Sequence, residues 1–191
     1  TDGRAIFKEM QAPGCRVART WEEAGALPPG KTLAVTAPGN LPPPSKRGDV
    51  FRQAALKALD TLSRNPDGFF LMIEGSNIDK AAHSNNLEEM MEELLDFDRT
   101  AGAVLDWAAK HPGTLVVITA DHNTGAFALT GGSREKGEIT ARFGSGSHDG
   151  VAVPVYSFGA GSGAFTGIYE NTAIFSKIMD AFKKGAGKPV R

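Results

Sequence analysis

The sequence lacks several features that mark whole classes of protein. Cys15 is its one cysteine, which excludes an internal disulfide and a cysteine-based zinc site. Acidic and basic residues nearly balance at 22 and 21, so net charge favours neither nucleic acid nor an anionic membrane surface as a partner. No apolar run approaches the roughly 18 residues of a membrane span. We therefore expect neither a nucleic acid nor a membrane partner.

An initiator methionine and a signal-peptide pattern are also missing, since the sequence begins at Thr1. We expect a processed or cut product, with a segment missing upstream. The 191 residues are enough for one domain with a sizeable core, and their hydrophobic content of 41% is typical of globular proteins.

Short apolar runs alternate with helical patterns along the chain. Buried strands are predicted over residues 69–73 and 115–119, and a last strand over residues 153–158. Amphipathic helices are predicted after Asp49, which is a candidate N-cap, and over residues 171–182. This alternation predicts an α/β fold with a mostly parallel central sheet flanked by helices.

Four further predictions follow from local sequence patterns. The proline-rich residues 37–48 read as an exposed loop, and Gly131-Gly132 as the turn of a hairpin. Residues 78–110 read as one long helical region, broken, if anywhere, near residues 98–100. Its acidic residues are interpreted as a solvated face opposite apolar ones, and they include Glu93 and Asp96.

The stretch GFFLMIEGSNIDKAAH, residues 68–83, carries the first candidate ligands. Glu74 follows a predicted buried strand, where open α/β sheets bind their ligands. Asp79 and His83 are four residues apart, so on a helix they share one face and can hold one metal ion. The alternative is a capped helix with one hydrogen-bonded histidine.

Two other polar groups lie beside predicted strands. Asp121 and His122 follow the strand over residues 115–119, and His148 precedes the last strand. Parallel strands bring their carboxyl ends to one edge, so the first group is expected to meet Asp79 and His83 there. His148 joins them only if its glycine-rich loop folds back. The alternatives are a turn at Asp121-His122 and a solvated loop histidine.

Together these side chains are more ligands than one ion needs. Two metal ions roughly 3.5–4 Å apart suit displacement at phosphorus, and a carboxylate at Glu74 suits Mg²⁺. The fourth histidine, His111, precedes Pro112 at a helix end and is interpreted as a structural partner of the helix dipole.

The motifs EGSNIDKAAH, TADH and GSHDG, followed by YENTAIFSKIMDAF, resemble the carboxyl-terminal half of bacterial alkaline phosphatases in order and internal spacing. The resemblance implies that Glu74 binds magnesium. It implies that Asp79, His83 and His148 bind one zinc, and that Asp121 and His122 bind the second. Lys80 occupies a position that contacts phosphate through water in some members.

The family also uses a serine or threonine nucleophile after an aspartate, and an arginine that holds phosphate. This chain has no Asp-Ser pair, and its one Asp-Thr pair, Asp60-Thr61, lies inside a predicted helix. We therefore expect residues 1–191 to be the carboxyl-terminal portion of an alkaline-phosphatase-like domain. The nucleophile is expected upstream, and this chain is expected to be inactive alone.

The resemblance implies hydrolysis of small phosphate monoesters with two Zn²⁺ and one Mg²⁺, in a homodimer that is periplasmic or secreted. Two alternatives stay open. One is a related zinc phosphodiesterase or phosphonate hydrolase of the same superfamily, and the other is a non-catalytic metal-binding module. The substrate preference cannot be read from these residues.

Overall fold

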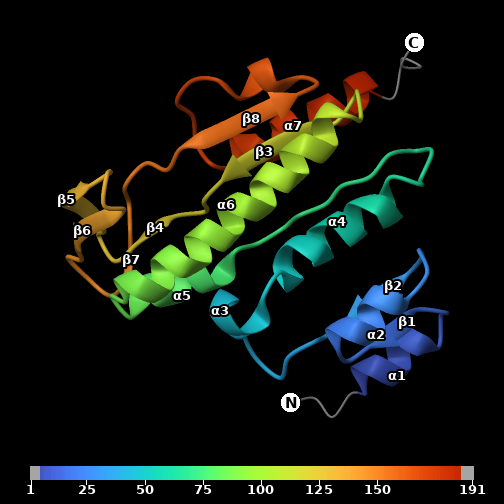
Figure 1. The fold of residues 1–191 in the computed structure, drawn as a ribbon. Helices are drawn as coiled ribbons and strands as arrows, with labels where there is room; N and C mark the ends of the chain where they lie inside the picture. The colour runs from blue at the N-terminus through green and yellow to red at the C-terminus, as the bar shows by residue number, and fades with distance from the viewer. Residues whose placement is uncertain (1–4, 186–191) are drawn as a thin grey trace. The chain divides into compact units, whose positions relative to one another are not determined.

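A computed structural model describes residues 5–185, which divide into two compact units between Glu74 and Gly75 (Figure 1). None of the described helices combines the length and hydrophobicity that a membrane crossing requires.

Over residues 5–74, the first unit contains four helices and a small parallel ladder, in which Val17 pairs with Leu33. Its elements are α1 (Ile6–Gln11), β1 (Arg16–Ala18), α2 (Trp21–Ala26), β2 (Thr32–Ala34), α3 (Pro44–Arg47) and α4 (Val50–Leu62). Helix α2 begins as its sequence indicates, because the Thr20 hydroxyl accepts a hydrogen bond from the Glu23 N–H.

Three predictions for this unit are corrected. The expected loop contains the short helix α3, which tolerates Pro44 in its first turn because no N–H is needed there. Asp49 makes no capping hydrogen bond to α4, and its carboxylate instead pairs with Arg52. Residues 69–73 are extended but pair with no strand among the described residues. Phe70 and Met72 are 59% and 73% exposed, so this segment is not buried on both faces.

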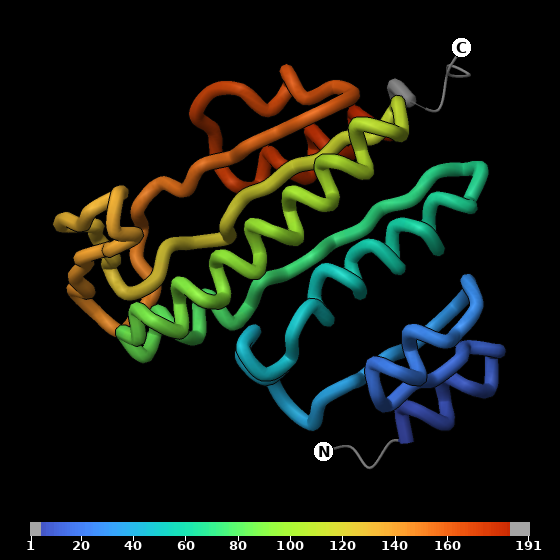
Figure 2. Tube along the Cα trace, viewed as in Figure 1, coloured from blue at the N-terminus to red at the C-terminus, as the bar shows by residue number. Residues whose placement is uncertain are grey.

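The second unit holds the predicted motifs. Its elements are α5 (Ser76–His83), α6 (Leu87–Ala109), β3 (Leu115–Thr119), β4 (Asn123–Thr124), β5 (Ala128–Ser133), β6 (Glu138–Arg142), β7 (His148–Asp149), β8 (Val155–Gly159), the 3₁₀ helix η1 (Ser162–Phe165) and α7 (Ala173–Gly185). Helix α6 packs along β3 and β8 (Figure 1). Near the amino-terminal end of α6, the elements α5, β4 and β7 lie together (Figure 2).

The long helical region is broken, but at Ser84–Asn86 and not near residues 98–100. Asn85 has φ 51, a left-handed conformation that asparagine tolerates better than most residues. Asn86 then caps α6 by accepting a hydrogen bond from the Glu89 N–H. The break gives α5 and α6 separate directions.

The acidic part of α6 is also not a simple solvated face. Glu93 and Asp96 are 4% and 2% exposed, whereas Leu94 and Leu95 are 41% and 50% exposed. The buried carboxylates have polar partners, because Asn77 donates to Glu93 and Arg99 to Asp96. Charge alone therefore misassigned the two faces of this helix.

The mostly parallel central sheet is not confirmed, because among the described residues only β1 and β2 pair in parallel. Strands β3 and β8 are antiparallel, with Val117 opposite Ser157. A parallel pair needs a crossover connection, usually a helix. The chain between β3 and β8 contains only short strands and loops, so it returns as an antiparallel ribbon.

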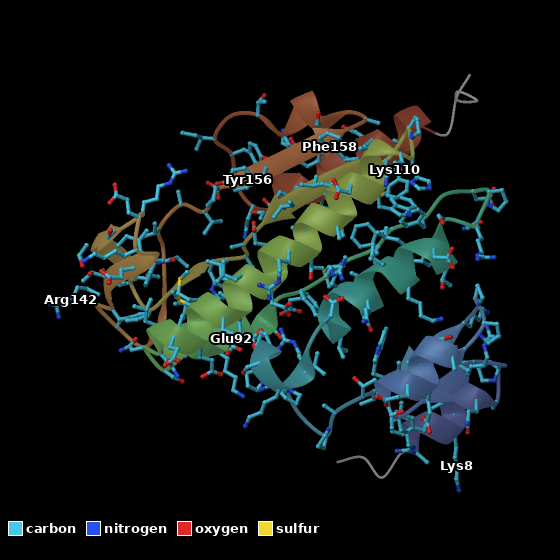
Figure 3. The ribbon with its side chains drawn as sticks, in the orientation of Figure 1. Lys8, Glu92, Lys110, Arg142, Tyr156 and Phe158 are labelled. Carbon is cyan, nitrogen blue, oxygen red and sulfur yellow. The ribbon has the colours of Figure 1, made fainter. Side chains whose placement is uncertain are left out.

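Beyond β4 lies the hairpin β5–β6, whose turn is at Arg134–Gly137, while Gly131 and Gly132 lie inside β5. The predicted turn is therefore misplaced by a few residues. A small core that contains Ala81, Ala82 and Met90, with Phe127 and Phe143 packed on it, joins α5 and α6 to this end of the ribbon. At the other end Tyr156 and Phe158 project from one exposed face of β8 (Figure 3).

Candidate metal centre

Helix α5 supplies two of the candidate ligands from one face. Asp79 Oδ2 and His83 Nε2 lie 3.4 Å apart, as expected for residues one helical turn apart. Both side chains are about two-fifths exposed. The prediction that these two residues face the same side is confirmed.

A two-residue ladder brings the third histidine to the same place. Strand β4 pairs with β7 so that Asn123 lies opposite Asp149 and Thr124 opposite His148. The glycine-rich loop thus folds back, as the sequence required for His148 to join the site. The loop is also held by Gly125, whose carbonyl accepts from the Gly144 and Ser145 N–H groups and whose N–H donates to Ser147.

Asp79, His83 and His148 form a cluster in which the ligand atoms all lie within 4.8 Å of one another. His148 Nε2 is 3.0 Å from His83 Nε2 and 3.5 Å from Asp79 Oδ1. Four ligands around zinc at about 2.0–2.2 Å would be separated by about 3.3–3.6 Å in a tetrahedron. The two aspartate–histidine separations, 3.4 and 3.5 Å, match this range, and the two histidine nitrogens at 3.0 Å lie slightly closer. The donor types and the approximate spacing of these residues therefore fit a zinc ion.

The tautomer of His83 also suits a metal ligand. Its Nδ1 lies 2.7 Å from the Gly146 carbonyl oxygen, which can only accept a hydrogen bond. Nδ1 therefore carries the proton, and the lone pair of a neutral ring lies on Nε2, which faces Asp79 and His148. Such a hydrogen bond from the outer nitrogen is typical of metal-binding histidines.

Asp121 and His122 lie beside this cluster, and neither belongs to it. The His122 ring stacks on His148, with centroids 3.6 Å apart, and its Nε2 lies 3.1 Å from Asp121 Oδ2. The Asp121 side chain is 86% exposed. Their role as ligands of a second zinc stays a prediction.

Thr124 is a site residue that the sequence reasoning missed. It is 6% exposed, and its Oγ1 lies 2.5 Å from Asp79 Oδ1 and 3.2 Å from His122 Nδ1. The hydroxyl can donate to the carboxylate and accept from the imidazole, so it links both predicted ligand pairs. Its position two residues after His122 in the sequence was the available signal.

Asp149 was missed as well. Its Oδ2 accepts from Asn123 Nδ2 at 2.9 Å and from the Ala126 N–H at 3.0 Å, and its Oδ1 accepts from the Val151 N–H at 3.1 Å. These hydrogen bonds, that of Val151 foremost, lower the pKa of Asp149 against the opposing effect of desolvation, and nearby His122 adds to the lowering. The carboxylate is therefore ionised at neutral pH.

The remaining predicted residues stay outside the cluster. Glu74 is exposed and ends the first compact unit, and Lys80 is exposed on α5. Their roles toward magnesium and phosphate stay predictions. His111 has the structural environment expected of it, because its Nδ1 lies 2.7 Å from the Trp107 carbonyl and its ring stacks on the Trp107 side chain.

Comparisons with known proteins bear on the family of the chain. The sequence model of the family described as alkaline phosphatase matches residues 2–143. Streptomycin-6-phosphate phosphatase of Streptomyces griseus is 29% identical over 94% of this chain and 51% of its own length. Alkaline phosphatase 4 of Bacillus subtilis is 35% identical over 70% of this chain and 29% of its own length. The chain thus spans about half the length of these relatives, or less.

Solved structures show the same α/β fold. The alkaline phosphatase of the Antarctic bacterium TAB5 superposes with a TM-score of 0.82 at 32% identity, covering 96% of this chain and 56% of that one. A variant of the same enzyme, with Mg bound in its M3 site, superposes with a TM-score of 0.81.

Proposed function

The chain belongs to the alkaline phosphatase family, and on that premise we propose that it is the metal-binding part of a phosphate monoesterase. One observation carries the proposal. Asp79, His83 and His148 come from segments up to 69 residues apart, and their ligand atoms converge within 4.8 Å. Their donor types and spacings suit zinc.

The proposed ligand set follows the family motifs. Asp79, His83 and His148 hold one zinc, Asp121 and His122 hold the second, and Glu74 contributes to a magnesium site. Bound metal would activate the attacking oxygen and stabilise charge on the leaving oxygen and the phosphoryl group. Lys80 is a weaker candidate for contact with the phosphate.

The chain's own residues prepare the site for these ions. His83 keeps its proton on Nδ1 through the Gly146 carbonyl, so Nε2 is available. Thr124 donates to one oxygen of Asp79 and thereby fixes the direction of the carboxylate.

No matching nucleophile accompanies the ligands. Asp60 and Thr61 lie within α4, a regular helix, and not at the end of a strand. We propose that the chain is the carboxyl-terminal portion of a larger α/β domain with a mostly parallel sheet. Robust hydrolysis of an aryl phosphate by the isolated chain, with Zn²⁺ and Mg²⁺ supplied, would contradict the proposed absence of a nucleophile.

The metal assignment is tested by comparing two histidine variants. His148→Ala is expected to lower zinc stoichiometry and affinity, measured by elemental analysis and by competition with a chromogenic chelator. His111→Ala is the matched control, since it removes an exposed histidine whose partners are Trp107 atoms. Unchanged zinc binding in His148→Ala would overturn the assignment.

Phosphate monoesters are the proposed substrates in preference to diesters. The Streptomyces relative is named for a phosphorylated streptomycin, which is a monoester. Parallel assays of the whole protein on an aryl monoester and an aryl diester would decide between them. A homodimer located in the periplasm or outside the cell is a further expectation from the family, and light scattering and cell fractionation would test it.

A further inference from the structure

The two-residue strand β7 places the His148 side chain at the proposed metal site and the Asp149 side chain away from it. His148 and Asp149 are adjacent, and successive side chains of a strand alternate between its faces. His148 Nε2 lies 3.0 Å from His83, whereas the Asp149 carboxylate lies among Asn123, Ala126 and Val151. Asp149 is therefore a neighbour of the site without belonging to the converging trio.

The segment that carries His148 needs restraint. Residues 144–150 include three glycines, which are conformationally permissive, and the β4–β7 ladder that holds them spans only two residue pairs. A displacement of the histidine by about 1 Å would far exceed the tolerance of metal coordination, which is about 0.2 Å in ligand distance.

Asp149 supplies this restraint from both sides of the ladder. Its Oδ2 accepts two hydrogen bonds, from the Asn123 side chain and the Ala126 backbone, both from the β4 side. Its Oδ1 accepts one from the Val151 backbone, beyond β7. Hydrogen bonds to an ionised carboxylate are stronger than those between neutral groups.

We propose that Asp149 is a positioning residue that holds His148 at zinc-binding distance from Asp79 and His83. The inference rests on the proposed function, because it assumes that these three side chains bind zinc. Asp149 touches neither metal nor substrate. It acts by fixing the backbone on which His148 stands.

The test compares Asp149→Ala and Asp149→Asn with the wild-type chain. Zinc affinity is measured by chelator competition, and the geometry of the site by the visible spectrum of the Co²⁺-substituted protein. Asp149→Ala is expected to weaken zinc binding by about ten-fold or more, in the range found for groups that orient metal ligands. Asp149→Asn retains one acceptor oxygen and is expected to fall between Asp149→Ala and the wild type.

Asn65→Ala is the matched control. Asn65 also ties a turn, accepting from the Asp67 N–H and donating to the Gly68 carbonyl, but it lies in the first unit. It is expected to leave zinc affinity and the Co²⁺ spectrum unchanged. A purely structural role for Asp149 would lower thermal stability without moving either readout, and would overturn the inference.

The outcomes separate this inference from the proposed function. Wild-type protein that binds no zinc overturns both. Wild-type protein that binds zinc, with Asp149→Ala binding it equally tightly, overturns the positioning role alone. If Asp149→Ala does not fold, Asp149→Asn decides in its place, and a wild-type affinity and Co²⁺ spectrum for that variant overturn the role.

Discussion

The two segments that supply the converging ligands are held in different ways. Asp79 and His83 are fixed by the geometry of one helix, α5, and need no distant contact to share a face. His148 is placed by pairing with Thr124, 24 residues earlier, and by hydrogen bonds between its loop and the Gly125 backbone. One part of the site is thus a local property of the chain, and the other depends on how the ribbon returns.

Removing the ligand that both segments share is expected to have the largest effect. Asp79 lies 3.4 Å from His83 and 3.5 Å from His148, so Asp79→Ala removes the carboxylate that faces both histidines. Zinc affinity should fall by more than the roughly 100-fold that marks the upper range for residues outside the ligand set. Chelator competition measures the change.

Asp106→Ala is the control for this variant, because Asp106 is an exposed aspartate on α6. It should bind zinc as the wild type does. Equal zinc affinity in Asp79→Ala and Asp106→Ala would mean that the helix and loop histidines do not share an ion through Asp79.

The next largest effect is expected from a methyl group added at Gly125, where the chain after β4 packs against the end of α5. Gly125 has φ +82, and a Cβ there would approach Phe143 at 2.9 Å and the Ala82 carbonyl oxygen at 3.1 Å. Gly125→Ala should lower the free energy of unfolding by about 1–3 kcal/mol, from backbone strain and overpacking. Urea unfolding of the metal-free protein measures this.

Gly102→Ala is the matched control, and its expected change in stability has the opposite sign. Gly102 lies inside α6 and a Cβ there would meet nothing within 4 Å. Alanine should therefore stabilise the helix by up to about 1 kcal/mol. Similar changes for both variants would show that the close packing around Gly125 does not matter.

Thr124 links the helix to the ribbon through its hydroxyl, which lies 2.5 Å from Asp79 Oδ1. Thr124→Val keeps the shape of this buried side chain and removes the hydrogen bonds, so it should cost about 1–2 kcal/mol of stability and weaken zinc binding several-fold. Thr124→Ser restores the hydroxyl and should recover most of both. Recovery of stability without recovery of zinc affinity would contradict the role assigned to the hydroxyl.

The local half of the site was predictable and the ribbon was not. The spacing of Asp79 and His83, together with the helical pattern around them, was enough to place them on one face of α5. The sequence also predicted β3, α4 and α7 closely. The prediction from sequence was wrong where a strand depends on pairing with a distant part of the chain. Residues 69–73 are apolar enough for a strand, but strand assignment requires a neighbouring chain that pairs with them.

The orientation of β8 is the most instructive of these errors. A parallel β8 would leave His148, which precedes it, at the edge away from Asp121 and His122. In the antiparallel ribbon the residues that follow β3 necessarily lie beside those that precede β8, as Thr119 opposite Val155 and Thr124 opposite His148 show. The antiparallel direction of β8, which the sequence did not predict, is thus the feature that brings His148 to the cluster.

The smallest expected effect separates helix stability from metal binding. Asn86 caps α6 just after the α5 segment, and Asn86→Ala should cost about 1 kcal/mol of stability. Thr20→Ala removes the corresponding cap of α2 and should cost a similar amount. Because Asp79 and His83 are arranged by α5 itself, neither variant should change zinc affinity. A several-fold loss in Asn86→Ala alone would show that the position of α5 depends on how α6 begins, and that the helical half of the site is less local than its sequence indicates.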